Sequence, residues 1–142
     1  MRAIEILKSG EEVPEKEITM APIIGKIAAG TPILAMENIT DYYPLPLDYF
    51  PTQNTLFILK VEGNSMMDIG ILNNDLVILE KRDYAENGDI VAAMVDNEEA
   101  TVKRYFNEGG RIRLQPENAS MEPMYFKSVM ILGKVIGLFR MF

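Results

Sequence analysis

The stretch NNDLVILEKRDYAENGDIVAAMV, residues 73–95, contains two short apolar runs, each introduced by a turn. The runs DLVILEK and DIVAAMV are rich in Val and Ile and show no helical periodicity. The turns Asn73-Asn74-Asp75 and Asn87-Gly88-Asp89 consist of residues that tolerate positive φ or bond to their own backbone. This stretch therefore predicts two β-strands.

The same texture continues on both sides of this stretch, from Ile18 onward. Further strands are expected at LFILKV (56–61), ATVKRYF (100–106), RIRLQP (111–116) and MILGKVIGLFR (130–140), and further turns at Asp96-Asn97-Glu98 and Asn107-Glu108-Gly109-Gly110. Short strands joined by tight turns predict an all-β fold of consecutive, mainly antiparallel strands with little helix. The segment from Asn38 to Pro51 carries three prolines and four aromatic residues, so we expect an irregular connection there.

The length of 142 residues suits one domain, which would bury roughly two thirds of the surface that its unfolded chain exposes. Residues 1–17 look like a polar leader or linker, and residues 18–142 are expected to form the domain. The net charge of −7 argues against a surface that binds phosphates, because affinity for nucleic acid depends on clustered Lys and Arg. The sequence has no apolar run of membrane-spanning length and no signal peptide, which favours a cytoplasmic protein.

Cysteine and histidine are both absent from the sequence. Their absence excludes Ser-His and Cys-His catalysis and leaves only oxygen ligands for a metal, for which no spaced cluster is found. We therefore expect no metal and no cofactor. Acid-base chemistry near neutral pH would need a carboxylate or a lysine whose pKa the fold has shifted.

Ser65 is one of only four serines, and it directly follows a predicted strand within EGNSMMD, residues 62–68. A turn there could present its hydroxyl at the start of a helical turn, beside backbone amides that can bind an oxyanion. Alternatively, Ser65 simply caps the turn from Met66 to Ile69.

Lys103 lies in a run of mixed polarity. Strand alternation puts Thr101, Lys103 and Tyr105 on one face of ATVKRYF. A lysine on a covered face would have a lowered pKa and could serve as a base, whereas an exposed one would only aid solubility. A third feature, GKIAAGTP at residues 25–32, could lie extended in a narrow cleft or form a plain turn after an edge strand.

Together and in this order, the three features resemble the LexA-type self-cleaving repressors, a family that includes phage repressors and UmuD-type polymerase accessory factors. GKIAAGTPILA is similar to the cleavage segment around an Ala-Gly bond, and VEGNSMMDIGILNNDLVILEK to the nucleophile region. ATVKRY is similar to the strand that bears the catalytic lysine, and LQPEN followed by Glu122-Pro123 to the region downstream. The resemblance runs from about Pro22 to the C-terminus and implies the β fold shared with signal peptidases.

This resemblance implies a serine endopeptidase with a Ser-Lys dyad. Lys103 would deprotonate Ser65, whose oxygen would attack the carbonyl carbon of Ala29 and release the amine of Gly30. The backbone amides of Asn64 and Ser65 are the expected donors to the oxyanion.

The resemblance also implies partners. A RecA filament on single-stranded DNA would act as co-protease, and cleavage would release the SOS response to DNA damage. Operator DNA would be bound only by an N-terminal helix-turn-helix domain that this chain lacks. The run from Met130 to Phe142 is apolar enough to add a strand to a second copy, so a homodimer through the C-terminal lobe is expected, with no membrane partner.

Three other interpretations of the function are considered. The chain could be a UmuD-like, self-processed accessory factor of a translesion DNA polymerase, or a non-catalytic β module that only dimerises. A relative of signal peptidase would need a membrane anchor, and none is found. The hairpin from Asp96 to Ala100 also looks one residue longer than the family pattern, and an uncompensated slip would turn Lys103 to the wrong face.

Overall fold

The computed structural model describes residues 14–28, 30–95 and 99–142. In these ranges the chain forms strands and 3-10 turns, and no α-helix. The elements in chain order are β1 (Ile18–Ile24), η1 (Met36–Asn38), β2 (Ile39–Pro46), η2 (Leu47–Tyr49), β3 (Leu56–Lys60), η3 (Met67–Ile69), β4 (Leu76–Lys81), β5 (Ile90–Val95), β6 (Glu99–Asn107), β7 (Ile112–Gln115), β8 (Met124–Phe126) and β9 (Met130–Phe139). The predicted all-β, mainly antiparallel fold is confirmed.

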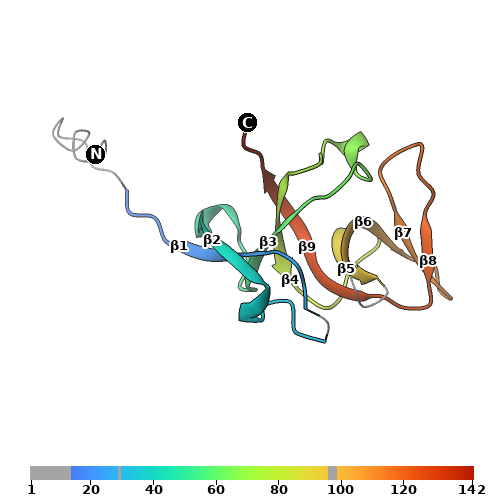
Figure 1. Ribbon diagram of the computed structural model, residues 1–142, viewed down its shortest axis with the longest axis horizontal. Helices are drawn as coiled ribbons and strands as arrows, with labels where there is room; N and C mark the ends of the chain where they lie inside the picture. Colours follow the sequence, from blue (N-terminus) through green and yellow to red (C-terminus); the bar gives the residue numbers. More distant parts are fainter. Residues whose placement is uncertain (1–13, 29, 96–98) are drawn as a thin grey trace.

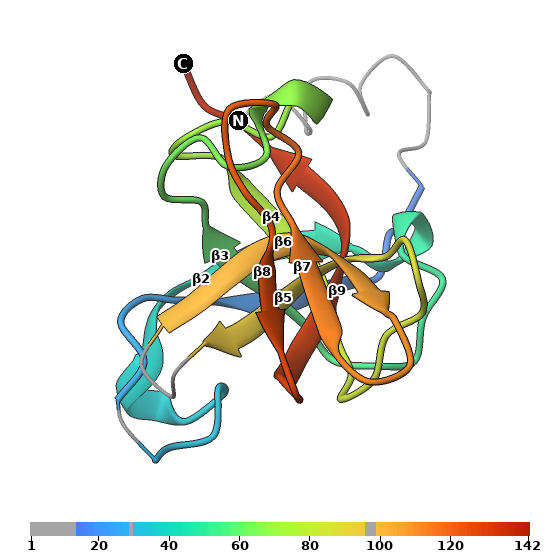
Figure 2. The same ribbon diagram turned by 90° about the vertical axis from the view of Figure 1, so that its right-hand side faces the viewer.

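The strands form one sheet in the order β2-β1-β3-β4-β9-β5-β6-β7-β8. In Figure 1, β1 to β4 lie on the left and β5 to β8 on the right, and β9 runs between the two groups. Figure 2 brings the group β5 to β8 to the front. The sheet is therefore divided into two halves that only β9 joins by strand pairing.

The segment from Asn38 to Pro51 corrects our expectation. It contains β2, an eight-residue strand, where an irregular connection was predicted. β2 lies at the edge of the sheet and pairs only with β1. An edge strand tolerates proline because one of its two sides needs no backbone donor, and Pro44 and Pro46 therefore do not break it.

Strand pairing is less sequential than predicted. β4 and β5 follow each other in the chain but do not pair, because β9 lies between them. β1 and β3 pair in parallel through Ile23 and Ile24. Pairing in the order of the sequence holds for β1-β2, β3-β4 and the series β5 to β8.

The turns behave largely as predicted. Asn74, Gly88 and Gly109 all have positive φ, as the three turn signals that contain them require. The predicted turn Asp96-Asn97-Glu98 lies outside the described residues, but Val95 pairs with Glu99 across it.

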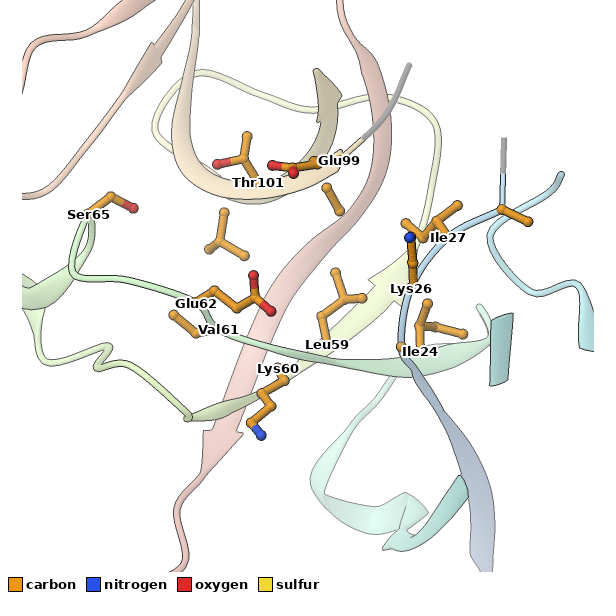
Figure 3. A pocket seen from close by; sticks show the side chains of 14 residues that line it. Ile24, Lys26, Ile27, Leu59, Lys60, Val61, Glu62, Ser65, Glu99 and Thr101 are labelled. Atoms are coloured by element: carbon orange, nitrogen blue, oxygen red, sulfur yellow. The ribbon is translucent and has the colours of Figure 1, made fainter. Parts of the chain in front are cut away.

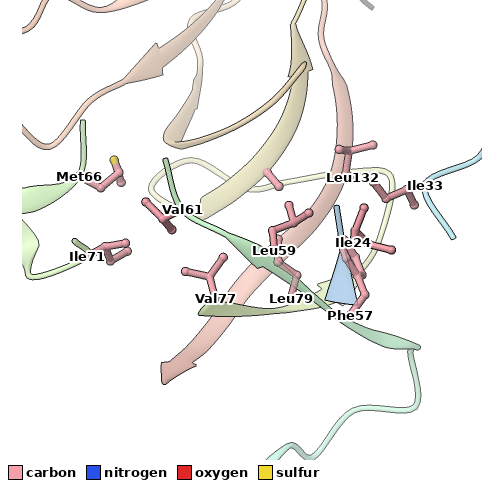
Figure 4. Close-up of a cluster of buried hydrophobic side chains, with 11 residues drawn as sticks. Ile24, Ile33, Phe57, Leu59, Val61, Met66, Ile71, Val77, Leu79 and Leu132 are labelled. Carbon is pink, nitrogen blue, oxygen red and sulfur yellow. The ribbon is translucent and has the colours of Figure 1, made fainter. Parts of the chain in front are cut away.

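The main hydrophobic cluster lies beneath the end of β3 and extends to the loop that follows (Figure 4). Its buried members are Ile24, Ile33, Phe57, Leu59, Val61, Met66, Ile71, Val77, Leu79, Ala92 and Leu132. Met66, the residue after Ser65, is 1% exposed. Burial of a methionine side chain contributes on the order of 2 kcal/mol and so anchors the turn that carries Ser65.

Candidate active site

Ser65 lies in the turn between β3 and β4. The turn begins at Gly63, which has a φ of 85° and donates its N–H to Asn73 Oδ1 at 2.7 Å. The short 3-10 helix η3 follows, and its N-cap residue is Met66, with no side-chain hydrogen bond at the cap. The alternative interpretation of Ser65 as a capping residue is therefore wrong, and its hydroxyl is available for another partner.

That partner is Lys103 in the middle of β6. Lys103 Nζ and Ser65 Oγ are 3.0 Å apart, which is hydrogen-bond distance. The two residues are 38 positions apart in the sequence, and the fold brings them together. The longer hairpin before β6 has not turned Lys103 to the opposite face.

The environment of Lys103 is unusual for a lysine. The residue is only 8% exposed, and burial lowers the pKa of its amine from the ordinary value of 10.5. Within the described residues its ammonium forms no ion pair with a carboxylate. Desolvation without a compensating negative charge disfavours the protonated form, so the neutral amine becomes accessible at a lower pH than in a solvated lysine.

Thr101 is a site residue that the sequence reasoning did not assign. Its Oγ1 is 2.6 Å from Lys103 Nζ, so the amine lies between two hydroxyl groups. The signal was present in the sequence, because Thr101 and Lys103 are two residues apart on a strand and therefore share a face. A hydroxyl carries no charge, so it orients the amine without stabilising the protonated form as a carboxylate would.

Ser65 and Thr101 open onto a cleft of about 760 Å³. Figure 3 shows Ser65 at one end of this cleft and Lys26 and Ile27 at the other, with Glu62 between them. The cleft is therefore open in front of the serine, and it is long enough to hold a peptide segment.

The segment around the expected cleavage site folds back on itself at the far end of this cleft. Ala29 lies outside the described residues, whereas Gly30 is described and has a φ of 75°. Thr31 donates both its N–H and its hydroxyl to the carbonyl oxygen of Ala28, at 3.2 and 2.7 Å. These bonds join Thr31 to Ala28, which lie on either side of the Ala29-Gly30 position.

Asn38 forms hydrogen bonds with the residues on both sides of this position. Its side chain is 1% exposed, and its Oδ1 accepts the N–H of Ala28 at 2.8 Å. Its Nδ2 donates to Thr31 Oγ1 at 3.0 Å and to the carbonyl oxygen of Pro32 at 2.9 Å. One buried amide thus satisfies backbone groups on both sides of the expected cleavage site.

The backbone amides of Asn64 and Ser65, our expected oxyanion donors, lie on the described turn. Neither donates to an acceptor within the part of the chain that the structure describes. No cluster of three or more metal-ligating side chains is found in those residues either. None of the helices among them has the length and apolar character needed to cross a membrane.

Comparison with known proteins agrees with this geometry. The family model Peptidase S24-like matches residues 22–136. The chain is 53% identical over 141 residues to the LexA repressor of Bacillus licheniformis, an alignment that covers 98% of this chain and 68% of that protein. It is 55% identical over 139 residues to the LexA repressor of Desulfitobacterium hafniense, which covers 98% of this chain and 67% of the relative. For the LexA repressor of Bacillus subtilis the identity is 50% over 139 residues, with 98% and 68% covered.

The family model covers most of the chain, and the similarity to the three repressors extends over nearly all of it. The resemblance inferred from the three motifs is thereby confirmed. The chain therefore belongs to the Peptidase S24-like family, as a self-cleaving serine peptidase of the LexA type.

Proposed function

We propose that Ser65 is the nucleophile and Lys103 the general base of a peptidase that cuts its own chain between Ala29 and Gly30. The contact of 3.0 Å between Lys103 Nζ and Ser65 Oγ carries this proposal, because it joins a hydroxyl to a buried amine with a lowered pKa. A serine hydroxyl is a weak nucleophile unless a base removes its proton. With no histidine in the sequence, a neutral lysine is the base that this site offers.

The reaction takes place in two stages. In the first, neutral Lys103 accepts the proton of Ser65 as Ser65 Oγ bonds to the carbonyl carbon of Ala29. Lys103 then gives that proton to the nitrogen of Gly30, which leaves as a free amine, and Ala29 stays bound to Ser65 as an ester. In the second stage, Lys103 takes a proton from water, which attacks the ester, and returns it to Ser65 Oγ as the new carboxyl terminus at Ala29 departs.

The tetrahedral intermediates place a negative charge on the former carbonyl oxygen of Ala29. We assign its stabilisation to the backbone amides of Asn64 and Ser65. Loss of one such donor in serine peptidases slows the reaction about 100- to 1,000-fold, so their orientation matters.

The cleavage loop must move before the reaction can occur. In the structure its residues Lys26 and Ile27 lie at the opposite end of the cleft from Ser65 (Figure 3). Docking of the loop would exclude water from Lys103 and lower its pKa further. Because the loop is tethered, its effective concentration in the cleft can be very high, so the undocked position protects the chain from continuous cleavage.

The names of the relatives suggest the biological setting. They are LexA repressors, so cleavage of this chain would inactivate a repressor and release the SOS response to DNA damage. A RecA filament on single-stranded DNA would act as the co-protease by favouring the docked loop. The chain carries a net charge of −7, so we assign operator binding to a DNA-binding domain outside it. The setting is cytoplasmic, and the active form is a homodimer.

Incubation of the purified chain at a series of pH values between 7 and 10 tests the chemistry. We expect two fragments separated after Ala29, identified by mass spectrometry, at a rate that rises with pH as Lys103 loses its proton. The variants Ser65→Ala and Lys103→Ala should both stay intact. A wild-type chain that remains whole, or a rate that is flat from pH 7 to 10, would contradict the assignment.

A further inference from the structure

The LQPEN motif, residues 114–118, spans the end of β7 and the start of the loop that follows, and the Ser-Lys chemistry assigns it no role. In the fold this loop lies against the turn that carries Ser65, although the two segments are more than 50 residues apart in the sequence. Asp68 N–H donates to the carbonyl oxygen of Glu117 at 2.9 Å, and Ala119 N–H donates to Asp68 Oδ2 at 2.8 Å. These two bonds hold the turn on the C-terminal side of Ser65.

A third bond holds the turn on the other side of Ser65. Asn118 Nδ2 donates to the carbonyl oxygen of Asn64 at 2.8 Å. The same oxygen also accepts the N–H of Met67, but at the longer distance of 3.3 Å. The hydrogen bond from Asn118 is therefore the shorter of the two that orient this carbonyl group.

The direction of that carbonyl group determines the direction of a catalytic amide. The carbonyl of Asn64 and the N–H of Ser65 belong to one planar peptide unit, and the described backbone contains no cis peptide bond. In a trans unit the C=O and N–H bonds point in opposite directions. A hydrogen bond that restrains the oxygen of Asn64 thus restrains the N–H of Ser65, which we assign to the oxyanion.

The loop itself is tied to the strand that carries the base. Arg104, the residue after Lys103 on β6, donates from Nε to Glu117 Oε2 at 2.7 Å. Asn118 follows Glu117, so a continuous series of contacts leads from Lys103 through this loop to Asn64 and Ser65. The base and the oxyanion amide are thereby held in one rigid arrangement.

We propose that Asn118 is a positioning residue that aims the Ser65 amide at the oxyanion. The proposal rests on the self-cleavage by Ser65 and Lys103 proposed above. Asn118 touches neither the nucleophile oxygen nor Lys103 Nζ, and its effect on the reaction passes through the Asn64–Ser65 peptide unit.

The variant Asn118→Asp tests the contact between Asn118 Nδ2 and the carbonyl oxygen of Asn64 without changing the other contacts of the side chain. Asn118 Oδ1 accepts the N–H and the hydroxyl of Ser120 at 3.0 and 2.8 Å, and an aspartate keeps both of these acceptor positions. It replaces only the NH2 group, so a carboxylate oxygen faces the carbonyl oxygen of Asn64. Asn118→Ala removes the contact without adding a charge.

Asn87 provides matched controls. Its Oδ1 accepts the N–H of Asn107 at 2.6 Å, and its Nδ2 faces the carbonyl oxygen of Asn107 at 3.5 Å. Asn87→Asp and Asn87→Ala therefore change the same atoms, at a turn that has no hydrogen bond to the Ser65 segment among the described residues. The adjacent Gly88 accepts a hydrogen bond from Arg104 Nη1 through its backbone carbonyl oxygen, an atom that neither substitution removes. Self-cleavage is measured for all five proteins between pH 7 and 10, with a thermal melt to establish that each is folded at the assay temperature.

We expect both Asn118 variants to cleave about 10- to 100-fold more slowly than the wild type at every pH, since a misaligned oxyanion donor acts on the barrier of the chemical step. For Asn118→Ala, the pH at which the rate is half-maximal should not move, because Lys103 is untouched and no charge is added. The Asn87 variants should match the wild type.

Rates for Asn118→Asp and Asn118→Ala equal to those of the Asn87 variants would overturn the positioning role. A shift in the half-maximal pH of Asn118→Ala would also overturn it, because the defect would then lie at Lys103. A wild-type chain that does not cleave would instead contradict the Ser-Lys assignment itself.

Discussion

At the scale of single residues, Lys103 shows how burying the proposed catalytic base costs stability. Its amine is buried next to two hydroxyl groups, and no carboxylate in the described residues neutralises it. A solvated lysine keeps its proton up to a pH near 10.5. In the fold, the cost of desolvating the charged form favours the neutral amine, which the proposed chemistry requires.

This burial makes the stability of the fold depend on pH. Between the lowered pKa of folded Lys103 and the unfolded value of 10.5, the unfolded chain binds one more proton than the folded chain. The free energy of unfolding must therefore rise with pH across that window. Above pH 10.5 the amine of Lys103 is neutral in both states, so the cost of burying its charge is gone and the free energy of unfolding no longer depends on pH through this residue.

We expect Lys103→Met to be more stable than the lysine form at pH 7, with a difference that shrinks as the pH approaches 10.5. Denaturant unfolding at several pH values measures it, with Ser65→Ala in both proteins to prevent cleavage. A stability difference that is constant with pH would mean that folded Lys103 keeps its proton.

At the scale of elements, β6 gives its two faces different tasks. Lys103 points to Ser65, and the next residue, Arg104, reaches the opposite side and binds Glu117. Side chains on a strand alternate, so one residue can supply the proposed base while the next holds the loop that supports the Ser65 turn. A one-residue slip in β6 would remove both contacts together.

The segment around the proposed cleavage site is the second element on which the proposed function depends. Asn38 bonds to Ala28, Thr31 and Pro32 and stabilises the turn at the far end of the cleft. A contact made only in the undocked state reduces the population of the docked state. Loss of this contact should therefore favour docking.

We expect Asn38→Asp to increase the rate of self-cleavage about tenfold, because each 1.4 kcal/mol lost from the undocked state raises the docked population tenfold. The carboxylate would face the carbonyl oxygen of Pro32, which the NH2 group now binds. The measurement is fragment formation at constant pH, with Asn87→Asp as the control. Slower cleavage would indicate that the turn enters the cleft intact.

At the scale of the whole molecule, β9 is the strand that connects the two halves of the sheet. Its residues 130–134 pair with β5 and its residues 133–139 with β4, which joins the two halves of the sheet. Gly133 allows this close packing, since a Cβ there would lie 2.7 Å from the carbonyl oxygen of Glu80. Gly133 and Lys134 pair with both β4 and β5, so a strand from a second copy could not be added at these two residues.

The remaining part of β9 still suits a dimer. Residues 135–139 have a strand partner on one side only among the described strands, and Met141 and Phe142 beyond them are exposed. We expect a dimer in sedimentation velocity, weakened by Met141→Glu together with Phe142→Glu. Met36→Glu, at an exposed methionine on η1, serves as the control and should leave the dimer intact. If the double variant sediments like the wild type, the dimer uses another surface.

The sequence by itself determined most of the strands and turns of this protein, because strand patterning and the choice of turn residues act between neighbours in the chain. Residues 73–95 are an example: both strands and both turns formed where they were predicted. The order of the motifs around Ser65 and Lys103 also indicated the family, which the comparisons confirmed.

Only the tertiary structure decided which strands meet. β2 tolerates its prolines because it lies at an edge, and β4 and β5 are separated because β9 pairs with both. The contacts of Lys103 with Ser65 and of Asn118 with Asn64 likewise exist only in the folded chain. Hydrogen bonds between strands and the burial of an amine depend on partners distant in sequence, and no local pattern encodes which of those partners will lie adjacent.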